Sequence, residues 1–331
     1  MKNGFCPSCL KPHRNGFCLP CRRRLFDGAK VTPMLGLSLP EFAAKKSDAA
    51  KRISISGVQP KYSLKRNGSQ LEFTDHGGEY ILKPVAQGVF DHMEAMPANE
   101  HVTMQIARQV FKIPTAECAL LTLSDGETPC YLTRRFDVLP DGSRQLQEDF
   151  AQVAQVSEPS HGKNYKYDFS YEKIGALMKN AVGAYAVEVE KLFRLVIFNY
   201  LIHNGDAHIK NFSLFRDRGT GMTRMTPAYD LLNTRLHLPN ESAMALDLFD
   251  NDHTTASYDA LGFYSHDDFY EFGVRLGITP QRIARHLDEM VSHETAIHVL
   301  LDNSFLPSAL VDRYKEMVQD RHRALTTKAV R

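Results

Sequence analysis

Residues 203–215 read HNGDAHIKNFSLF and contain the densest group of chemically active side chains in the chain. They directly follow LFRLVIFNYLI at 192–202, an apolar run that predicts a buried helix. Within nine residues, 203–211, the stretch places one aspartate, two histidines, one lysine and two asparagines. A buried helix that ends in such a cluster holds the polar groups rigidly, which favours a catalytic role over a solvated loop.

The spacing of these groups favours phosphoryl transfer. Asp206 and Asn211 are five residues apart, and Asp230, in PAYDLLNT, follows nineteen residues after Asn211. Protein kinases take a catalytic aspartate and a metal-binding asparagine from one loop at this spacing, and a second metal-binding aspartate from a later segment. We therefore predict Asp206 as the catalytic base and Asn211 and Asp230 as Mg²⁺ ligands. Turn chemistry explains each residue singly, but it does not explain their joint placement.

Two further residues of this stretch are predicted to act in catalysis. His208 is expected to buttress the loop by hydrogen bonding, and Lys210 to neutralise charge on the transferred phosphoryl group. A purely structural role fits either residue equally well.

The composition is that of an ordinary globular protein. The chain has 331 residues, enough for one two-lobed domain or two smaller ones, with 43% hydrophobic and 24% charged residues. The net charge of +1 gives no overall basic field for nucleic acid. No apolar segment reaches the roughly 18 residues needed to span a bilayer, and the start, MKNGFCPSC, lacks a signal core. We expect a cytoplasmic protein that binds neither membranes nor nucleic acid directly.

Four cysteines near the start, Cys6, Cys9, Cys18 and Cys21, have the spacing C-x2-C-x8-C-x2-C. In a reducing compartment such paired steps favour a structural zinc site over disulfides, since four thiolates suit tetrahedral Zn²⁺. The alternative is a set of free thiols in a short tail. Cys118 and Cys130 lie in apolar, strand-like segments and are predicted to be core residues.

The pattern along the chain predicts an α+β protein with two lobes. Residues 1–26 form a small zinc-binding segment. Residues 27–145 form a sheet-rich lobe, with strands at ISISG, KYSLKRN, LEFTDHG, EYILKPV, ECALLTL and CYLTRRFDV, a turn at Asn67-Gly68 and one helix at 98–111. Residues 146–331 form an all-helical lobe, in which the polar stretch 156–167 is predicted to be the least ordered.

At this point the sequence resembles the HipA-like serine/threonine kinases of bacterial toxin–antitoxin systems. The resemblance covers roughly residues 50 to 325. It rests on seven motifs in order: ISGVQPKYSL, EYILKP, NEHVTMQIA, RRFDV, QEDFAQ, HNGDAHIKNFSL and YDLLNT. The short N-terminal part is similar to that of the HipT toxins of three-gene HipBST systems, although the four-cysteine segment is a departure. The resemblance implies a two-lobed protein-kinase-like fold and an ATP- and Mg²⁺-dependent enzyme.

The resemblance also assigns roles in the first lobe. Lys83, at the end of EYILKP, is expected to meet the ATP phosphates, and Glu100 in the next helix to pair with it. A surface lysine and a helix-dipole acid are the structural alternatives. Phe136, in RRFDV, is expected to stack on adenine, although a strand phenylalanine is more often core.

The loop SISGVQPK is expected to cover the phosphates through Ser56, Gly57 and Lys61. It carries a single glycine, so it is neither a Walker A nor a G-x-G-x-x-G motif. The resemblance implies autophosphorylation at Ser54 and Ser56. Phosphate there would repel the loop from the phosphates of ATP.

Partners and substrate follow from the resemblance alone. It implies a small HipS-like antitoxin, a DNA-binding HipB-like protein and, as substrate, a glutamyl- or tryptophanyl-tRNA synthetase. The sequence is also compatible with two other functions. One is a small-molecule or lipid kinase, because D-x-H-x-x-N also occurs in phosphoinositide kinases. The other is a degenerate kinase fold that only binds partners.

Overall fold

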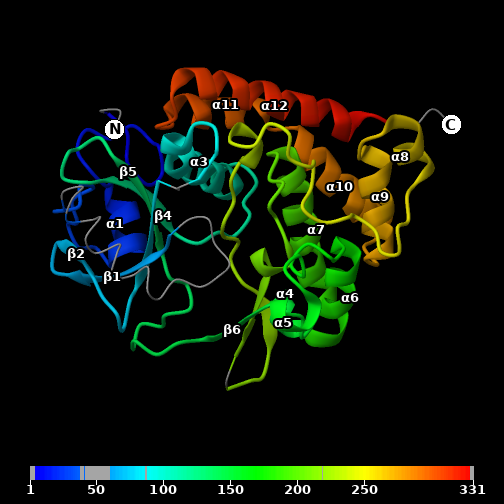
Figure 1. The fold of residues 1–331 in the computed structure, drawn as a ribbon, viewed down its shortest axis with the longest axis horizontal. Coiled ribbons are helices and arrows are strands. Elements are labelled where there is room, and N and C mark those ends of the chain that lie inside the picture. Colours follow the sequence, from blue (N-terminus) through cyan, green and yellow to red (C-terminus); the bar gives the residue numbers. More distant parts are fainter. Residues whose placement is uncertain (1–3, 38–40, 42–59, 86–87, 218, 329–331) are drawn as a thin grey trace.

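A five-stranded antiparallel sheet forms the centre of the N-terminal lobe (Figure 1). The computed structural model describes residues 4–37, 41, 60–85, 88–217 and 219–328. The strands lie in the order β2-β1-β3-β5-β4. Their bounds are β1 (Tyr62–Asn67), β2 (Gln70–Phe73), β3 (Tyr80–Pro84), β4 (Cys118–Thr122) and β5 (Pro129–Arg134). Each of these strands was predicted, and the strand predicted at 53–57 lies outside the described residues.

Local signals explain how this sheet forms. The β1–β2 hairpin turns at Gly68, whose φ of +60° suits glycine, and the Asn67-Gly68 signal predicted this turn. The predicted helix appears as α3 (Met96–Gln109), preceded by the short helix η1 (Met93–Ala95). It packs against β4 and β5. Cys118 and Cys130 are fully buried in the sheet, which confirms their predicted place in the core.

The four-cysteine segment packs directly onto this lobe. It includes α1 (Leu19–Phe26), which begins with a proline at its second position, where the missing N–H is not needed. The hydroxyl of Ser8 donates to the Cys118 carbonyl at 2.9 Å, and the hydroxyl of Tyr80 donates to the Leu25 carbonyl at 2.8 Å. The segment is therefore part of the lobe's core rather than a separate tail.

The C-terminal lobe is mainly helical. Its helices are α4 (Phe150–Val153), α5 (Glu158–His161), α6 (Tyr171–Ala181), α7 (Tyr185–Leu201), η2 (Ile209–Asn211), η3 (Thr234–Leu236), α8 (Ala256–Leu261), α9 (His266–Arg275), α10 (Pro280–Val291), α11 (Glu294–Asn303) and α12 (Ser308–Thr326). The sequence predicted α6, α7, α9, α10 and α12. It did not predict α11, which is separated from α10 by only two residues.

A small sheet corrects the prediction that this lobe is all-helical. β6 (Leu146–Asp149), β7 (Ser213–Arg216) and β8 (Thr223–Met225) form a three-stranded antiparallel sheet in that order. Each strand has three or four residues, too few for an alternating pattern to be recognised. β7 follows the 203–211 stretch directly, so the sheet anchors the loop that holds Asp206.

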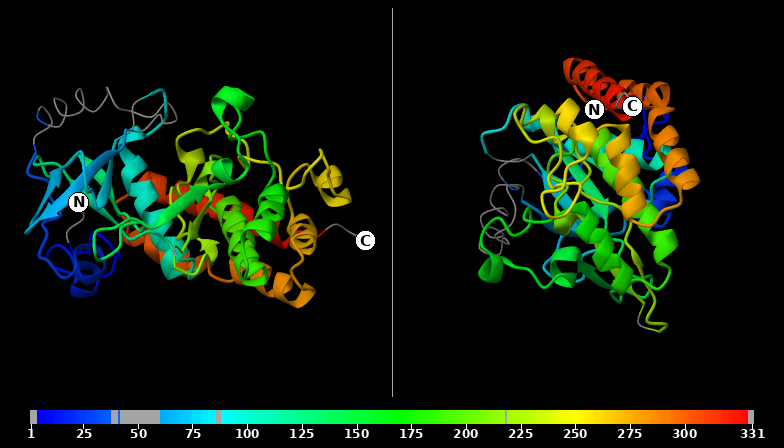
Figure 2. Two further views of the ribbon diagram at one scale, coloured as in Figure 1. Left: turned by 90° about the horizontal axis from the view of Figure 1, so that it is seen from below. Right: turned by 90° about the vertical axis from the view of Figure 1, so that its right-hand side faces the viewer.

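Two helices join the lobes. α11 and α12 run along one side of the molecule, past α3 and on over the C-terminal helices (Figure 1). A hydrogen bond of 3.0 Å between the hydroxyls of Thr103 in α3 and Tyr314 in α12 ties the lobes together. α1 and α8 lie at opposite ends of the long axis (Figure 2). Among the described residues, no helix combines the length and the apolar character that a membrane span requires.

Candidate active site

A pocket of about 420 Å³ lies between the two lobes and is lined by most of the residues predicted for the kinase site. These are Lys61, Lys83, Glu100, Asp206, His208, Lys210, Asn211 and Asp230. Lys61 lies just before β1, and the others come from β3, α3, the loop after α7, η2 and the segment after β8. The fold therefore brings together side chains that are up to 169 residues apart in the chain.

Lys83 lies at the centre of this pocket and is buried. Its Nζ lies 2.6 Å from Glu100 Oε1 and also contacts Asp230 Oδ1. Lys61 Nζ approaches the other oxygen of Asp230, Oδ2, at 3.3 Å. Strand β3 and helix α3 thus supply one ion pair, Lys83–Glu100, and Asp230 joins it from the second lobe.

Burial and charge set the protonation of this cluster. Burial would raise the pKa of Asp230, but the ammonium groups of Lys61 and Lys83 hold that pKa well below its usual range. Burial would lower the pKa of Lys83, and the carboxylates of Asp230 and Glu100 raise it above its ordinary value instead. Asp230 is therefore a carboxylate and Lys83 an ammonium at neutral pH, which is the charge state that binding of metal and phosphate requires.

Asp230 also has an unusual backbone. Its φ is 55°, in the left-handed region that non-glycine residues rarely adopt. Aspartate tolerates this region better than most residues, because its short side chain bonds locally. Backbone of this kind concentrates at functional sites, where the surrounding structure holds it in place.

Asp206 lies at the more open end of the pocket, with half of its side chain exposed. Its Oδ1 accepts a hydrogen bond of 2.6 Å from the hydroxyl of Tyr167, and His208 Nε2 lies 4.0 Å away. The backbone N–H of His208 donates to Asn211 Oδ1 at 3.1 Å, so the loop folds back on itself across η2. Burial lowers the pKa of His208 to about 4, so its ring is neutral at pH 7.

Glu241 supports the loop that carries Asp206 through a chain of hydrogen bonds. The N–H of Gly205 donates to Thr234 Oγ1 at 2.8 Å, and the Thr234 hydroxyl in turn donates to Glu241. Burial raises the pKa of Glu241 to about 7; the Thr234 hydrogen bond opposes this shift and the negative charge of Asp206 adds to it. A titratable carboxyl that the sequence did not single out therefore lies beside the predicted base.

Replacing Gly205 tests this support. A Cβ atom at Gly205 would lie 2.6 Å from Glu241 Cδ and 2.7 Å from the Ser242 carbonyl oxygen, closer than real contacts allow. We expect Gly205→Ala to destabilise the protein by roughly 1–3 kcal/mol, the cost of overpacking, in urea unfolding. Gly183→Ala is the matched control, because a Cβ there meets nothing within 4 Å. Equal stability of the two variants would contradict the tight packing behind Asp206.

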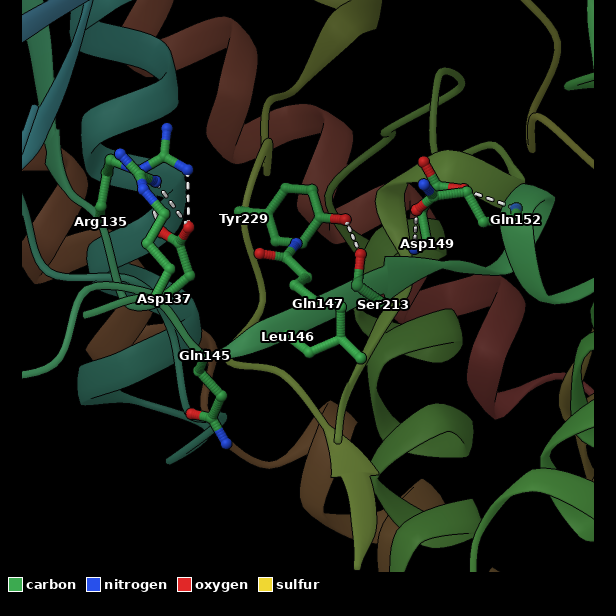
Figure 3. Close-up of a pocket in the computed structure, with 10 residues that line it drawn as sticks. Arg135, Asp137, Gln145, Leu146, Gln147, Asp149, Gln152, Ser213 and Tyr229 are labelled. Carbon is green, nitrogen blue, oxygen red and sulfur yellow. Dashed lines mark hydrogen bonds and ion pairs between the residues drawn. The ribbon is translucent and has the colours of Figure 1, made fainter. Parts of the chain in front are cut away.

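A second pocket, also of about 420 Å³, adjoins the first and shares Tyr229 with it (Figure 3). On one side Asp137 Oδ2 binds Arg135 Nη2 at 2.7 Å and Arg144 Nη1 at 2.9 Å. On the other side the Tyr229 hydroxyl donates to the Lys210 carbonyl at 2.9 Å and also contacts the Ser213 hydroxyl. This pocket is lined mainly by polar groups at the junction of the lobes.

Phe136 lies beside this second pocket. Its ring centroid lies 5.5 Å from that of Phe215 and 5.8 Å from that of Tyr229. The ring therefore packs against the aromatic side chains that bridge the lobes. The stacking of adenine on Phe136 stays a prediction.

The four sulfur atoms of Cys6, Cys9, Cys18 and Cys21 lie within 4.8 Å of one another. The Sγ atoms of Cys9 and Cys18 are 3.7 Å apart. Zn–S bonds of about 2.3 Å in a tetrahedron place the sulfur atoms about 3.8 Å apart. The donor set and its spacing therefore fit a structural zinc ion.

Several site residues were not predicted, for a common reason. Tyr167 lies in the stretch predicted to be the least ordered, and Tyr229 and Glu241 lie outside any pattern with metal or nucleophile spacing. Only the fold brings them to the pocket. Tyr229 alone has a local signal, because it opens the YDLLNT motif and directly precedes Asp230. The predicted loop residues Ser54, Ser56 and Gly57 lie outside the described residues.

Comparison with known proteins agrees with this fold. The chain matches the model of the HipA-like C-terminal domain over residues 53–297. It is 27% identical to a provisionally named kinase of Haemophilus influenzae, over 93% of each chain. It is 33% identical to Y4dM of Sinorhizobium fredii, also provisionally named a kinase, over 69% of this chain and 63% of that protein. It is 27% identical to the serine/threonine-protein kinase toxin HipA of Shewanella oneidensis, over 60% of this chain and 48% of that protein.

Solved structures show the same architecture. HipA from a complex of HipA, HipB and operator DNA of Shewanella oneidensis superposes with a TM-score of 0.65 at 20% identity, over 86% of this chain and 70% of that chain. The Helicobacter pylori proinflammatory kinase CtkA superposes with a TM-score of 0.53 at 16% identity, over 79% of this chain and 93% of that chain. Both are similar in fold. Since the family match covers most of the chain and the fold superposes on these structures over most of its length, the protein belongs to the HipA-like C-terminal domain family and has its two-lobed, kinase-like fold.

Proposed function

We propose that this chain is an ATP- and Mg²⁺-dependent serine/threonine protein kinase that acts as the toxin of a toxin–antitoxin system. The observation that carries the proposal is the single pocket that holds the Lys83–Glu100 pair, Asp230, Asn211 and Asp206. A degenerate fold would have no need to keep this set together. The relative that is named as a HipA toxin supports the toxin role.

Each residue of the pocket has a separate role in the proposed reaction. Lys83, held by Glu100, offsets charge on the ATP phosphates. Asp206 accepts the proton as the serine oxygen of the substrate bonds to the γ-phosphorus and the bond from that phosphorus to the β–γ bridging oxygen breaks, so that ADP leaves. The carboxylate of Asp230 and the amide oxygen of Asn211 fit the oxygen preference of Mg²⁺. When bound, this ion neutralises phosphate charge.

The remaining side chains have supporting roles in this proposal. The neutral ring of His208 lies beside Asp206 and buttresses the loop. Lys61 and Lys210 line the pocket and add positive charge near the phosphates. The second pocket, at the lobe junction, receives the base and ribose of ATP, with Phe136 beside them.

The substrate and the partners belong to the same proposal. We infer a tRNA synthetase, glutamyl or tryptophanyl, as substrate, since its phosphorylation blocks translation. A HipB-like DNA-binding protein is proposed as partner, because the solved HipA complex contains HipB and operator DNA. A small HipS-like antitoxin is proposed as the second partner. Ser54 and Ser56 are proposed as autophosphorylation sites. Zn²⁺ is proposed to bind the four cysteines, whose spacing fits it.

Label transfer from ATP tests the kinase assignment. The purified protein, with Mg²⁺ and γ-³²P-ATP in a bacterial lysate, is expected to label proteins on serine or threonine. EDTA and the Lys83→Met variant are expected to abolish the label. Label in metabolites or lipids alone would overturn the protein-kinase assignment. No ATP consumption at all would favour a binding module instead.

A further inference from the structure

The predicted base already has a hydroxyl partner. The phenol of Tyr167 donates to Asp206 Oδ1 at 2.6 Å. This is the short distance of an O–H donor on a charged carboxylate, the strong class of hydrogen bond. A general base must lie within about 2.6–3.2 Å of the proton that it abstracts. The Tyr167 hydroxyl therefore stands where the hydroxyl of a phosphoryl acceptor has to bind.

The surroundings hold the ring of Tyr167 in this position. Its centroid lies 5.4 Å from that of His208 in an edge-to-face contact, and Lys166 Nζ lies 4.7 Å from the ring centroid on its face. The N–H of Ile209 donates to the Lys166 carbonyl at 3.3 Å and ties the main chain to the catalytic loop. Burial and the Asp206 carboxylate raise the pKa of Tyr167, so the phenol remains a donor at all physiological pH values.

The part of the segment that precedes Tyr165 is held loosely, whereas Tyr165 and Phe169 pack against the hydrophobic core. Side chains 157–164 are all exposed, so little apolar surface holds them. The Tyr167 N–H bonds the Asn164 carbonyl at 2.7 Å, within the same turn. The turn therefore retains its own hydrogen bonds when it shifts. Its ties to the catalytic loop are few: the Tyr167–Asp206 bond, the Lys166–Ile209 bond and the His208 ring contact.

We propose that the Tyr167 hydroxyl caps the catalytic base, Asp206, and that the hydroxyl of the substrate displaces the Tyr167 hydroxyl from it. This inference rests on the proposed kinase function. The phenol and the substrate hydroxyl compete for one carboxylate oxygen, so the cap weakens acceptor binding. When no acceptor is present, it also occupies the position at Oδ1 that an attacking water would take, although half of the Asp206 side chain is exposed, and it thereby limits hydrolysis of ATP. In hydrolysis, water replaces the serine oxygen: the new bond joins water oxygen to the γ-phosphorus, ADP leaves and Asp206 takes the proton.

Tyr167→Phe tests the cap, because it removes one oxygen and leaves the ring contacts with His208 and Lys166. We expect the rate of ADP release with water alone as acceptor to rise roughly threefold to tenfold, the effect of losing one partly exposed, charge-assisted hydrogen bond. The KM for ATP should not change. Backbone amides at 157–169 should exchange hydrogen faster in the variant, because their tie to Asp206 is lost.

Tyr165→Phe is the matched control, since Tyr165 lies two residues away in the same segment and outside the pocket. Its rate should equal that of the wild type. Turnover of ATP that is unchanged or slower in Tyr167→Phe would overturn the cap and leave the kinase assignment standing; a slower rate would mean that Tyr167 positions Asp206 for catalysis. Absence of ATP turnover in both wild type and variant would overturn the kinase assignment and the cap with it.

Discussion

Asp206→Asn is expected to lower phosphoryl transfer roughly 10²–10⁴-fold, the scale of a lost general base. The amide has nearly the shape of the carboxylate but cannot accept the proton of the attacking hydroxyl. ATP binding should survive, because Lys83, Glu100 and Asp230 hold one another independently of Asp206. A fluorescent ATP analogue and a ³²P-transfer assay on the same preparation measure the two effects separately.

Asp168→Asn serves as the control for this variant. Asp168 is exposed, lies near Tyr167 in the chain and is not among the residues that line the pocket. It should retain wild-type transfer. Peptide mapping by mass spectrometry adds a second readout, since Ser54 and Ser56 should carry phosphate in the wild type and none in Asp206→Asn. Undiminished toxicity of Asp206→Asn in cells would contradict the kinase account of the toxin.

The sequence was sufficient for those parts of the site that local motifs specify. The loop with Asp206 and Asn211 follows an apolar helix, and Lys83 lies near the end of the apolar, strand-like run EYILKP, so each is visible within a dozen residues. Their meeting in one pocket depends on the two-lobed fold, which the family resemblance implied. Tyr167 and Glu241 have no such signal. Each reaches the pocket only through packing, and single polar residues in loops are commonly just solvated.

The secondary-structure elements that were not predicted also lack a local signal, in most cases because they are short. β6, β7 and β8 are three to four residues long, and short strands form because neighbouring elements pair with them, not because of their own sequence. The helix α11 was missed because no glycine or proline separates it from α10. The stretch 156–167 was predicted to be the least ordered from its polar composition. It instead contains α5 and carries Tyr167 to Asp206.

Loss of zinc is expected to destabilise the N-terminal lobe by on the order of 4 kcal/mol, the range of substitutions that remove a bound metal. The loop between Cys6 and Cys9 contacts α3 at two points. His101 Nε2 lies 2.8 Å from the Ser8 carbonyl oxygen, and Gln109 Nε2 donates to the Cys9 carbonyl at 2.8 Å. Glu100 directly precedes His101, so the loop between Cys6 and Cys9 braces α3, the helix that holds the partner of Lys83.

Cys9→Ser should therefore lower the zinc content, the unfolding free energy and the affinity for ATP together. Elemental analysis, chemical unfolding and nucleotide titration measure the three quantities. Cys130→Ala is the control, because it perturbs the buried sheet while leaving the four ligands intact; it should lose stability and keep its zinc. A wild-type protein without zinc, or a Cys9→Ser variant with full stability, would show that the cysteines pack as free thiols. A stability loss that leaves ATP affinity unchanged would mean that α3 keeps Glu100 in place without the brace.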